Sequence, residues 1–229
     1  MAENTTRFLR QPDILPPGKL QFPIVVIGAG AIGSAAVVTL TKTGCSNITV
    51  WDPDTLEEHN ASNQLCRLDA IGKPKVDALA QLTTDLTGVS LKSVCAAYRG
   101  QRLQGVVIVA VDSMTARQEV WKRVKLDHAV PLLIDARMGA AFARVYAVHP
   151  TNMDDVDFYE QNLYAAEETE RLPCSARAII YWPTVIGGLI ALLAKAHATG
   201  VVPAREILFD LPSLKLMTVS AARQAALVA

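Results

Sequence analysis

The feature that most constrains this chain is a glycine loop set between a strand pattern and a helix pattern. Residues 24–27 are a run of β-branched side chains, typical of a strand buried on both faces. Gly28, Gly30 and Gly33 follow as G-x-G-x-x-G, and a helical pattern spans 31–43. Such a loop lets the backbone approach a phosphate at the positive end of a helix. The loop predicts a nucleotide-binding βα unit, although a turn without a ligand is an alternative that the glycines alone leave open.

The rest of the chain alternates between strand and helix patterns. Helices are predicted over residues 75–86 and 113–126, and strands over 48–51, 91–96, 105–111, 131–134 and 143–148. Strands that alternate with helices indicate an α/β fold with a Rossmann-like, doubly wound sheet. We therefore expect a mostly parallel sheet with helices on both faces, followed by a C-terminal extension.

Three segments describe the expected organisation of the chain. We predict an N-terminal arm over 1–20 and a nucleotide-binding Rossmann-like domain over 21–150. Residues 151–229 should complete the same fold with a crossover loop and a C-terminal region of helix and strands. Within that region, the acidic and aromatic residues 150–173 predict a loop or lid, and 206–220 predict two strands broken at Leu211-Pro212.

Composition excludes several classes of function. The 22 basic residues equal the 22 acidic ones, so nothing indicates a nucleic-acid partner. The uncharged stretch 178–194 is shorter than the roughly 20 residues of a membrane span, and it contains Pro183. We expect a buried or interface helix there and no membrane contact. The cysteines form no C-x-x-C pair and no secretory signal precedes them, which favours a cytoplasmic protein without structural zinc.

Two polar residues indicate which nucleotide is bound. Asp52 follows the second predicted strand, where a carboxylate accepts hydrogen bonds from ribose hydroxyls. That position does not separate NAD from ATP. The polar stretch that begins there ends at Lys75, at the start of a predicted helix. Because a triphosphate needs a fixed cation to balance its charge, Lys75 favours ATP.

These motifs together resemble the bacterial form of the ubiquitin-activating superfamily, the ThiF, MoeB and HesA adenylyltransferases. The resemblance covers about residues 7 to 200. It rests on the glycine loop together with Asp52 and Asp54 of D-P-D, Asn60 and Gln64 of N-x-x-x-Q, Lys75 of G-K-P-K, and Asp112 after a strand. The resemblance implies that these residues bind ATP, with Lys75 on the phosphates and Asp112 on Mg²⁺. The alternatives are an ordinary surface lysine at Lys75 and a helix N-cap at Asp112.

The N-terminal arm adds to the resemblance. Residues 7–11, R-F-L-R-Q, are similar to an R-Y-x-R-Q motif in which the second arginine reaches the ATP of the other subunit. The resemblance therefore implies a homodimer in which Arg10 acts in trans. A flexible basic terminus is the alternative interpretation.

Two positions bear on catalysis itself. Asn63 stands where the family usually has an arginine, and Arg67 in the same loop is the candidate replacement. Cys174 lies in the expected crossover loop, where some relatives form a thioester. Arg177 and a helix start could activate its thiol. A small buried thiol without a catalytic role is the alternative for Cys174.

The resemblance implies ATP-dependent adenylation of the C-terminal carboxylate of a ubiquitin-like, β-grasp carrier protein, with a thioester as a further step. Two alternatives remain at this stage. An NAD-dependent oxidoreductase explains the glycine loop and Asp52 but not Lys75 or Asp112. A non-catalytic, nucleotide-binding relative is suggested by Asn63.

Overall fold

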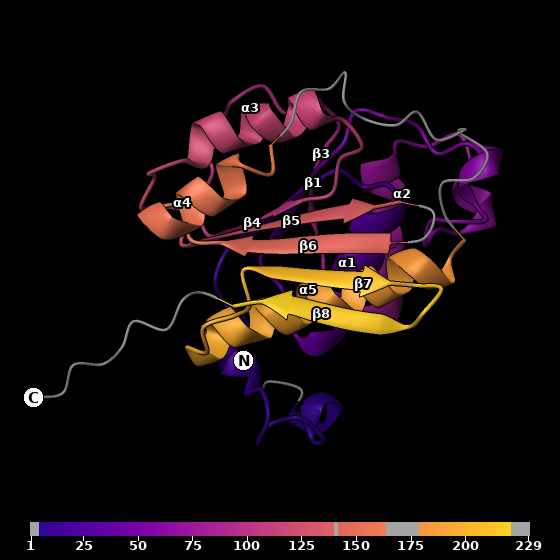
Figure 1. Ribbon diagram of the computed structural model, residues 1–229. Coiled ribbons are helices and arrows are strands. Elements are labelled where there is room, and N and C mark those ends of the chain that lie inside the picture. Colours follow the sequence, from indigo (N-terminus) through magenta and orange to yellow (C-terminus); the bar gives the residue numbers. More distant parts are fainter. Residues whose placement is uncertain (1–4, 140–141, 164–178, 221–229) are drawn as a thin grey trace, which may run out of the picture.

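An eight-stranded sheet in the order β3-β2-β1-β4-β5-β6-β7-β8 runs through the middle of the molecule (Figure 1). The computed structural model describes residues 5–139, 142–163 and 179–220. The parallel strands are β1 (Ile24–Ile27), β2 (Ile48–Trp51), β3 (Lys92–Val94), β4 (Val106–Val109) and β5 (Leu132–Met138). The antiparallel part adds β6 (Phe142–Val148), β7 (Glu206–Asp210) and β8 (Lys215–Val219). This arrangement confirms the predicted doubly wound sheet with a C-terminal extension.

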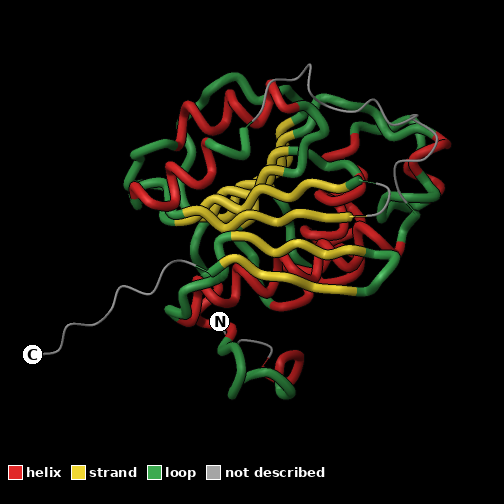
Figure 2. The backbone as a smooth tube through the Cα atoms, viewed as in Figure 1, coloured by secondary structure: helices red, strands yellow, loops and turns green. Residues whose placement is uncertain are grey.

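Helices cover both faces of the sheet (Figure 2). One face packs against α1 (Ala31–Thr43), α2 (Lys75–Thr87) and α5 (Tyr181–Thr199), and the other against α3 (Met114–Val124) and α4 (Met153–Glu160). Short 3₁₀ turns occupy Thr5–Phe8, Pro17–Leu20, Glu58–Asn60 and Leu68–Ala70. The change of face between α2 and α3 follows from right-handed crossovers that run in opposite directions along the sheet, from β1 to β2 on one side and from β4 to β5 on the other.

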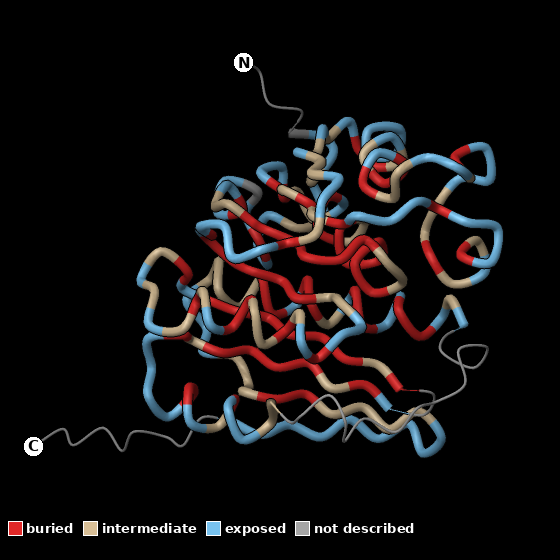
Figure 3. The backbone as a smooth tube through the Cα atoms, turned by 90° about the horizontal axis from the view of Figure 1, so that it is seen from above, coloured by how far each residue is buried: buried red, intermediate tan, exposed pale blue. Residues whose placement is uncertain are grey.

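The central strands explain why the sheet is so well specified by sequence. Every residue of β1 and β4 is buried, as their uninterrupted apolar runs predict (Figure 3).

The strand order reverses between β1 and β4, because β1 leads to β2 on one side and β4 leads to β5 on the other. In such sheets ligands bind at the carboxyl ends of the strands beside this switch point. The glycine loop leaves β1 at that point.

Three predicted elements differ from the structure. The strand expected at 131–134 continues to Met138, because ion pairs allow Asp135 and Arg137 to lie inside it. The segment predicted as a loop over 150–173 contains α4, whose N-terminus is capped by Asn152: its side chain accepts a hydrogen bond from the Asp155 N–H at 3.2 Å. The helix predicted at 178–194 runs from Tyr181 to Thr199 and ends at Gly200 in the left-handed region.

The α5 helix packs closely against α1. A Cβ added at Gly187 would lie 2.8 Å from the backbone carbon of Ala35, so only glycine permits this approach. Pro183 lies in the first turn of α5, where no helical hydrogen bond to its nitrogen is needed. No helix in the described part of the chain is long and apolar enough to cross a membrane.

Two adjacent glycines of α5 provide a matched test of this packing. We expect Gly187→Ala to lower the free energy of unfolding by about 1–3 kcal/mol, because the methyl group must displace the α1 backbone. Gly188→Ala should instead leave the free energy of unfolding of a single chain unchanged or raise it by up to about 1 kcal/mol, since nothing in the described part of its own chain lies within 4 Å of its added Cβ. Urea unfolding of both variants measures the difference. Equal stabilities would contradict the close packing of α1 and α5.

Candidate functional site

The glycine loop packs directly against the turn that follows β4. Gly28 has a φ of +103°, and a Cβ there would lie 2.6 Å from the Ala110 carbonyl oxygen. At Gly33 an added Cβ would lie 1.9 Å from the Gly28 carbonyl oxygen. Gly30 differs, because nothing lies within 4 Å of its added Cβ. Gly28 and Gly33 are therefore required by packing, and Gly30 leaves open space beside the N-terminus of α1.

Asp52 lies under this loop at the end of β2. Its Oδ2 accepts a hydrogen bond from the Ala29 N–H at 2.6 Å, and its Oδ1 accepts one from the Asp54 N–H at 2.8 Å. Burial raises the pKa of Asp52 and outweighs these two hydrogen bonds. Each carboxylate oxygen has a second lone pair, so both can still accept a hydroxyl donor. A ribose diol would offer two such hydroxyl donors.

Asp54 connects Asp52 to Lys75. The Asp54 carboxylate accepts from Lys75 Nζ at 2.7 Å, and its carbonyl accepts from the Lys75 backbone N–H at 2.9 Å. The Lys75 side chain is only 12% exposed, whereas that of Asp54 is 60% exposed. A bridge between Thr55 and Pro74 fixes the two ends of the intervening segment together. The start of α2 is thereby held beside Asp52, with an ammonium group at its first residue.

Asn60 and Gln64 lie in the segment between Asp54 and Lys75, and both are buried. The Asn60 side-chain oxygen accepts from the Glu57 N–H at 2.9 Å, and its carbonyl accepts from the Gln64 N–H at 2.9 Å. The next residue, Leu65, donates its N–H to Ser34 Oγ in the first turn of α1 at 3.1 Å. The Asn60–Gln64 segment therefore lies against the start of α1, next to the glycine loop.

Asp112 follows β4 on the other side of the switch point and is exposed. The N-cap of α3 is Ser113, whose side chain accepts from the Ala116 N–H at 3.3 Å, so capping does not occupy Asp112. No three His, Cys, Asp or Glu side chains gather into a metal cage in the described ranges. A lone exposed carboxylate fits a Mg²⁺ ion whose other ligands are phosphate oxygens and water.

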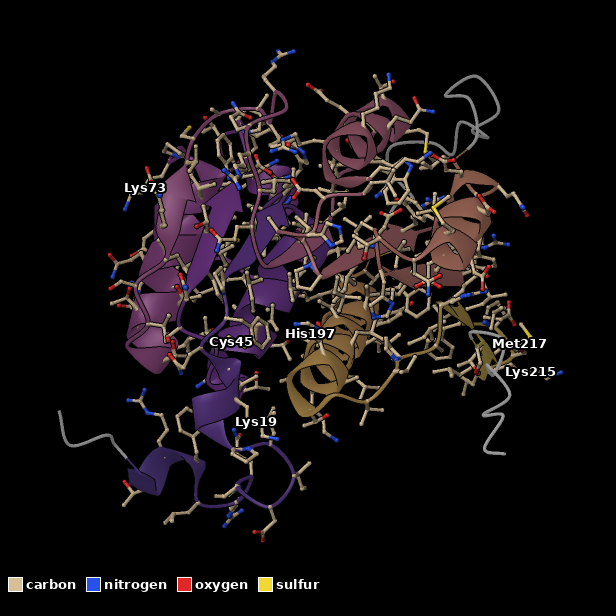
Figure 4. All side chains as sticks on the ribbon, turned by 90° about the vertical axis from the view of Figure 1, so that its left-hand side faces the viewer. Lys19, Cys45, Lys73, His197, Lys215 and Met217 are labelled. Carbon is tan, nitrogen blue, oxygen red and sulfur yellow. The ribbon has the colours of Figure 1, made fainter. Side chains whose placement is uncertain are left out.

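Arg67 points away from this site. Its guanidinium binds Asp69 at 2.7 Å and Asp85 at 3.0 Å, and these two carboxylates raise its pKa. Asp85 lies ten residues after Lys75 on α2, about 15 Å along the helix. Arg67 lines a surface hollow of about 290 Å³ that also includes Lys73. Figure 4 shows Lys73 on the flank of the molecule opposite Lys215 and Met217.

Arg10 is also distant from the glycine loop of its own chain. The arm is anchored by Arg7, which donates to the Thr87 carbonyl, and by Gln11, whose Nε2 donates to the Thr43 carbonyl at 2.7 Å. Thr43 and Thr87 are the last residues of α1 and α2. Since α1 starts at the glycine loop and is about 20 Å long, the arm docks at the opposite edge of the sheet. The arm lies outside the main body at that edge (Figure 1).

Sequence reasoning missed a buried ionic cluster beside the switch point. Asp135 of β5 is fully buried and binds Arg117 of α3, Arg137 Nε at 2.8 Å and the Tyr159 hydroxyl at 2.9 Å. Burial and the Asp135 charge raise the pKa of Tyr159 well above its ordinary value, so the phenol remains a donor. A carboxylate directly after the apolar run 132–134 is the sequence signal that could have indicated this cluster. Cys174 lies outside the described residues.

The amino-acid sequence matches a known protein family over most of its length. Residues 20–226 match the ThiF family. The chain belongs to the ThiF family. This confirms the resemblance that the glycine loop, the D-P-D motif and the G-K-P-K motif predicted.

Relatives of this ThiF-family chain include activating enzymes. Ubiquitin-like modifier-activating enzyme 5 of Arabidopsis thaliana is 27% identical in an alignment 123 positions long that covers 44% of this chain and 28% of that protein. Adenylyltransferase and sulfurtransferase MOCS3-1 of Zea mays is 27% identical in a gapped alignment 235 positions long that covers 96% of this chain and 49% of that protein. The chain thus spans half or less of the length of these relatives.

Solved structures share the fold of this ThiF-family chain. The crystal structure of E. coli MccB with AMPCPP and MccA has a TM-score of 0.75 at 16% identity, covering 98% of this chain and 74% of that one. E. coli MccB with ATP has a TM-score of 0.73 at 17% identity, covering 92% and 67%. At this level of identity the similarity establishes the α/β architecture.

Substitutions at Gly30 and Gly33 distinguish the contribution of the glycine loop to ATP binding from its contribution to packing. We expect Gly30→Ala to lower the free energy of unfolding by less than about 1 kcal/mol, since only the N-cap preference changes. The added methyl group should nevertheless weaken ATP binding about tenfold or more, because it fills the space through which a phosphate approaches. Isothermal titration calorimetry and thermal unfolding measure the two quantities.

Gly33→Ala is the matched control for this prediction. It should lower the free energy of unfolding by about 1–3 kcal/mol, because its methyl group would overlap the Gly28 carbonyl. Unchanged ATP affinity in a folded Gly30→Ala variant would show that no phosphate lies at the loop.

Proposed function

We propose that this chain is an ATP-dependent adenylyltransferase that activates the C-terminal carboxylate of a protein or peptide substrate. The observation that carries the proposal is the connected set of contacts from Ala29 through Asp52 and Asp54 to Lys75. It sets hydroxyl acceptors and an ammonium group beside a glycine loop at the switch point. Membership of the ThiF family supports the same activity.

The proposed reaction needs positioned charge and no general base. A carboxylate oxygen of the substrate attacks the α-phosphorus of ATP, the bond from that phosphorus to the bridging oxygen breaks, and pyrophosphate leaves with the electron pair. No proton is transferred in this step. Asp52 orients the ribose, and the N–H groups at the start of α1 face the phosphates. Lys75 neutralises phosphate charge, and Asp54 holds it at the loop.

Asp112 is the proposed protein ligand of Mg²⁺. The ion would supply further neutralisation of the phosphates. The exposed carboxylate of Asp112 follows the strand next to β1, so it lies across the switch point from Asp52. Asn60 and Gln64 would complete the nucleotide site by holding their segment over the first turn of α1.

The substrate that we propose is a ubiquitin-like, β-grasp carrier protein. The ubiquitin-like modifier-activating enzyme among the relatives supports this choice over a free small acid. A thioester would follow adenylation if the Cys174 thiolate attacks the acyl carbon of the adenylate: the carbon–sulfur bond forms, the bond from that carbon to the phosphate oxygen breaks, and AMP leaves with the electron pair. The isolated cysteines suit the reducing cytoplasm as the compartment of this chemistry.

A homodimer is part of the proposal. The face of α5 opposite α1 is apolar and exposed at Tyr181, Val185 and Leu192, with Gly188 between them. A second copy of the chain would bury this stripe. It would also give Arg10 an ATP to reach, because the arm docks about 20 Å from the glycine loop of its own chain.

One observation favours a second candidate, a nucleotide-binding relative without catalysis. Asn63 replaces the expected arginine, and Arg67, its candidate substitute, is bound to Asp69 and Asp85 instead. For Arg67 to act on ATP, it must leave both carboxylates. The non-catalytic chain would bind ATP but would not exchange pyrophosphate.

ATP–pyrophosphate exchange tests the activity. With Mg²⁺ and β-grasp proteins encoded near its gene, we expect the chain to exchange labelled pyrophosphate only when the partner has its intact C-terminus. Lys75→Ala and Asp112→Ala should each reduce exchange about a hundredfold or more, because each removes a charge that stabilises the transferring phosphate. Loss of exchange in Arg67→Ala would show that Arg67 replaces the arginine missing at position 63, whereas unchanged exchange would leave it only its ion pairs with Asp69 and Asp85. ATP binding without exchange by any candidate partner would favour the non-catalytic relative.

Subunit mixing tests the role of Arg10. Arg10→Ala and Lys75→Ala should each be inactive alone, whereas mixed dimers contain one site with both residues intact. Exchange should recover to about a quarter of the wild-type value, since half of the dimers are mixed and half of their sites are complete. No recovery on mixing, although mixed dimers are detected by native mass spectrometry, would assign Arg10 to its own subunit. Full exchange by Arg10→Ala alone would show that Arg10 has no role.

A further inference from the structure

The buried cluster around Asp135 is joined to the turn that carries Asp112. Arg117 lies in the first turn of α3 and is only 5% exposed. Its Nη1 donates to Asp135 Oδ1, and its Nη2 donates to the Val111 carbonyl and, at 3.3 Å, to that of Ala136. Val111 is the residue before Asp112. One guanidinium therefore connects α3, β5 and the end of β4.

Both neighbours of Asp112 in sequence are thus fixed while its own side chain remains exposed. Val111 is held through its carbonyl by Arg117, and Ser113 is held as the N-cap of α3 by the Ala116 N–H. Asp135 cannot turn away from Arg117, because Arg137 Nε and the Tyr159 hydroxyl bind its other oxygen. The hydrogen bonds to Val111 and Ser113 therefore fix the backbone of the turn on both sides of Asp112, and the Asp112 carboxylate remains accessible to an ion.

The chemistry of the cluster argues for a role beyond stability. Burying two guanidinium groups and a carboxylate carries a desolvation cost, and well-packed apolar side chains often stabilise a core as well or better. An arginine fork instead fixes geometry, because its donors point in set directions. Here those directions are the Val111 carbonyl, in the turn after β4, and the Asp135 carboxylate, on the neighbouring strand β5.

We propose that Arg117, held by Asp135, is a positioning residue that sets the Asp112 carboxylate for Mg²⁺ bound to the nucleotide. This inference rests on the proposed function only in taking Asp112 as the magnesium ligand. It requires neither a carrier protein nor the adenylation step. Arg117 itself touches neither the ion nor ATP, so its effect must pass through Asp112.

The test is the affinity for ATP measured with Mg²⁺ and with EDTA, by calorimetry and without any protein substrate. The wild-type chain should bind more tightly with Mg²⁺. Arg117→Lys keeps the charge but cannot reach both acceptors, so the ratio of the two affinities should fall about tenfold. Binding in EDTA should change less than about twofold, because the glycine loop and Asp52 are untouched. The control, Arg123→Lys, makes the same change on α3 at a pair with Asp127 and should keep the wild-type ratio.

Two further variants keep the result interpretable. In an Asp112→Ala background, Arg117→Lys should cause no additional loss, because both act through one carboxylate. If Arg117→Lys does not fold, as thermal unfolding would reveal, Asp135→Asn keeps the shape and weakens the hold on Arg117. The ratio of the affinities with Mg²⁺ and with EDTA should fall by a smaller factor in Asp135→Asn than in Asp112→Ala.

Each outcome decides the proposal. Three results would overturn the proposal while leaving adenylation intact. The first is a wild-type ratio of affinities in folded Arg117→Lys, and the second is an equal loss of ATP affinity with Mg²⁺ and with EDTA. The third is a further loss of affinity when Arg117→Lys is combined with Asp112→Ala. No Mg²⁺ dependence in the wild-type chain would overturn both this inference and the role of Asp112. Failure of the adenylation proposal has its own signature, which is the absence of pyrophosphate exchange despite Mg²⁺-dependent ATP binding.

Discussion

The contact between two backbone turns at the switch point is the constraint on which the rest of the site depends. The loop after β1 lies so close to the turn after β4 that a methyl group at Gly28 would be 2.6 Å from the Ala110 carbonyl oxygen. This contact brings the start of α1 and the turn before α3 to one edge of the sheet. Residues far apart in sequence, such as Asp52 and Asp112, meet there because parallel strands end at the same edge.

Charges around that edge are held in two different ways. On the β2 side, Lys75 is paired with Asp54, whose carboxylate is mostly exposed. Because water solvates the Asp54 carboxylate, this pair is weaker than a buried one and leaves the ammonium group able to attract a phosphate as well. On the β5 side, Arg117 is paired with the fully buried Asp135 and is fixed. In the proposed mechanism Asp54 holds Lys75 at the loop, where its ammonium group faces the phosphates, whereas Arg117 fixes the turn that carries Asp112.

The length of α1 separates the N-terminal arm from the glycine loop of the same chain. The N-terminal arm binds the carbonyl groups at the far ends of α1 and α2, so Arg10 is separated from its own glycine loop by the length of a helix. The exposed apolar stripe of α5 offers a surface on which a second copy could bring that arm to an ATP. The docking of the arm and the apolar stripe both favour a shared site over a self-contained one.

The sequence by itself determined the central strands, the glycine loop and the positions of Asp52 and Lys75, because apolar runs and turn chemistry are local patterns. It also determined the ThiF relationship through the spacing of its motifs. Only the tertiary structure decided that β5 continues through Asp135 and Arg137, that α4 forms within the expected loop, and that Arg67 is bound to Asp69 and Asp85. Buried ion pairs join residues that are distant in sequence, so no local pattern predicts which partner a charged side chain finds.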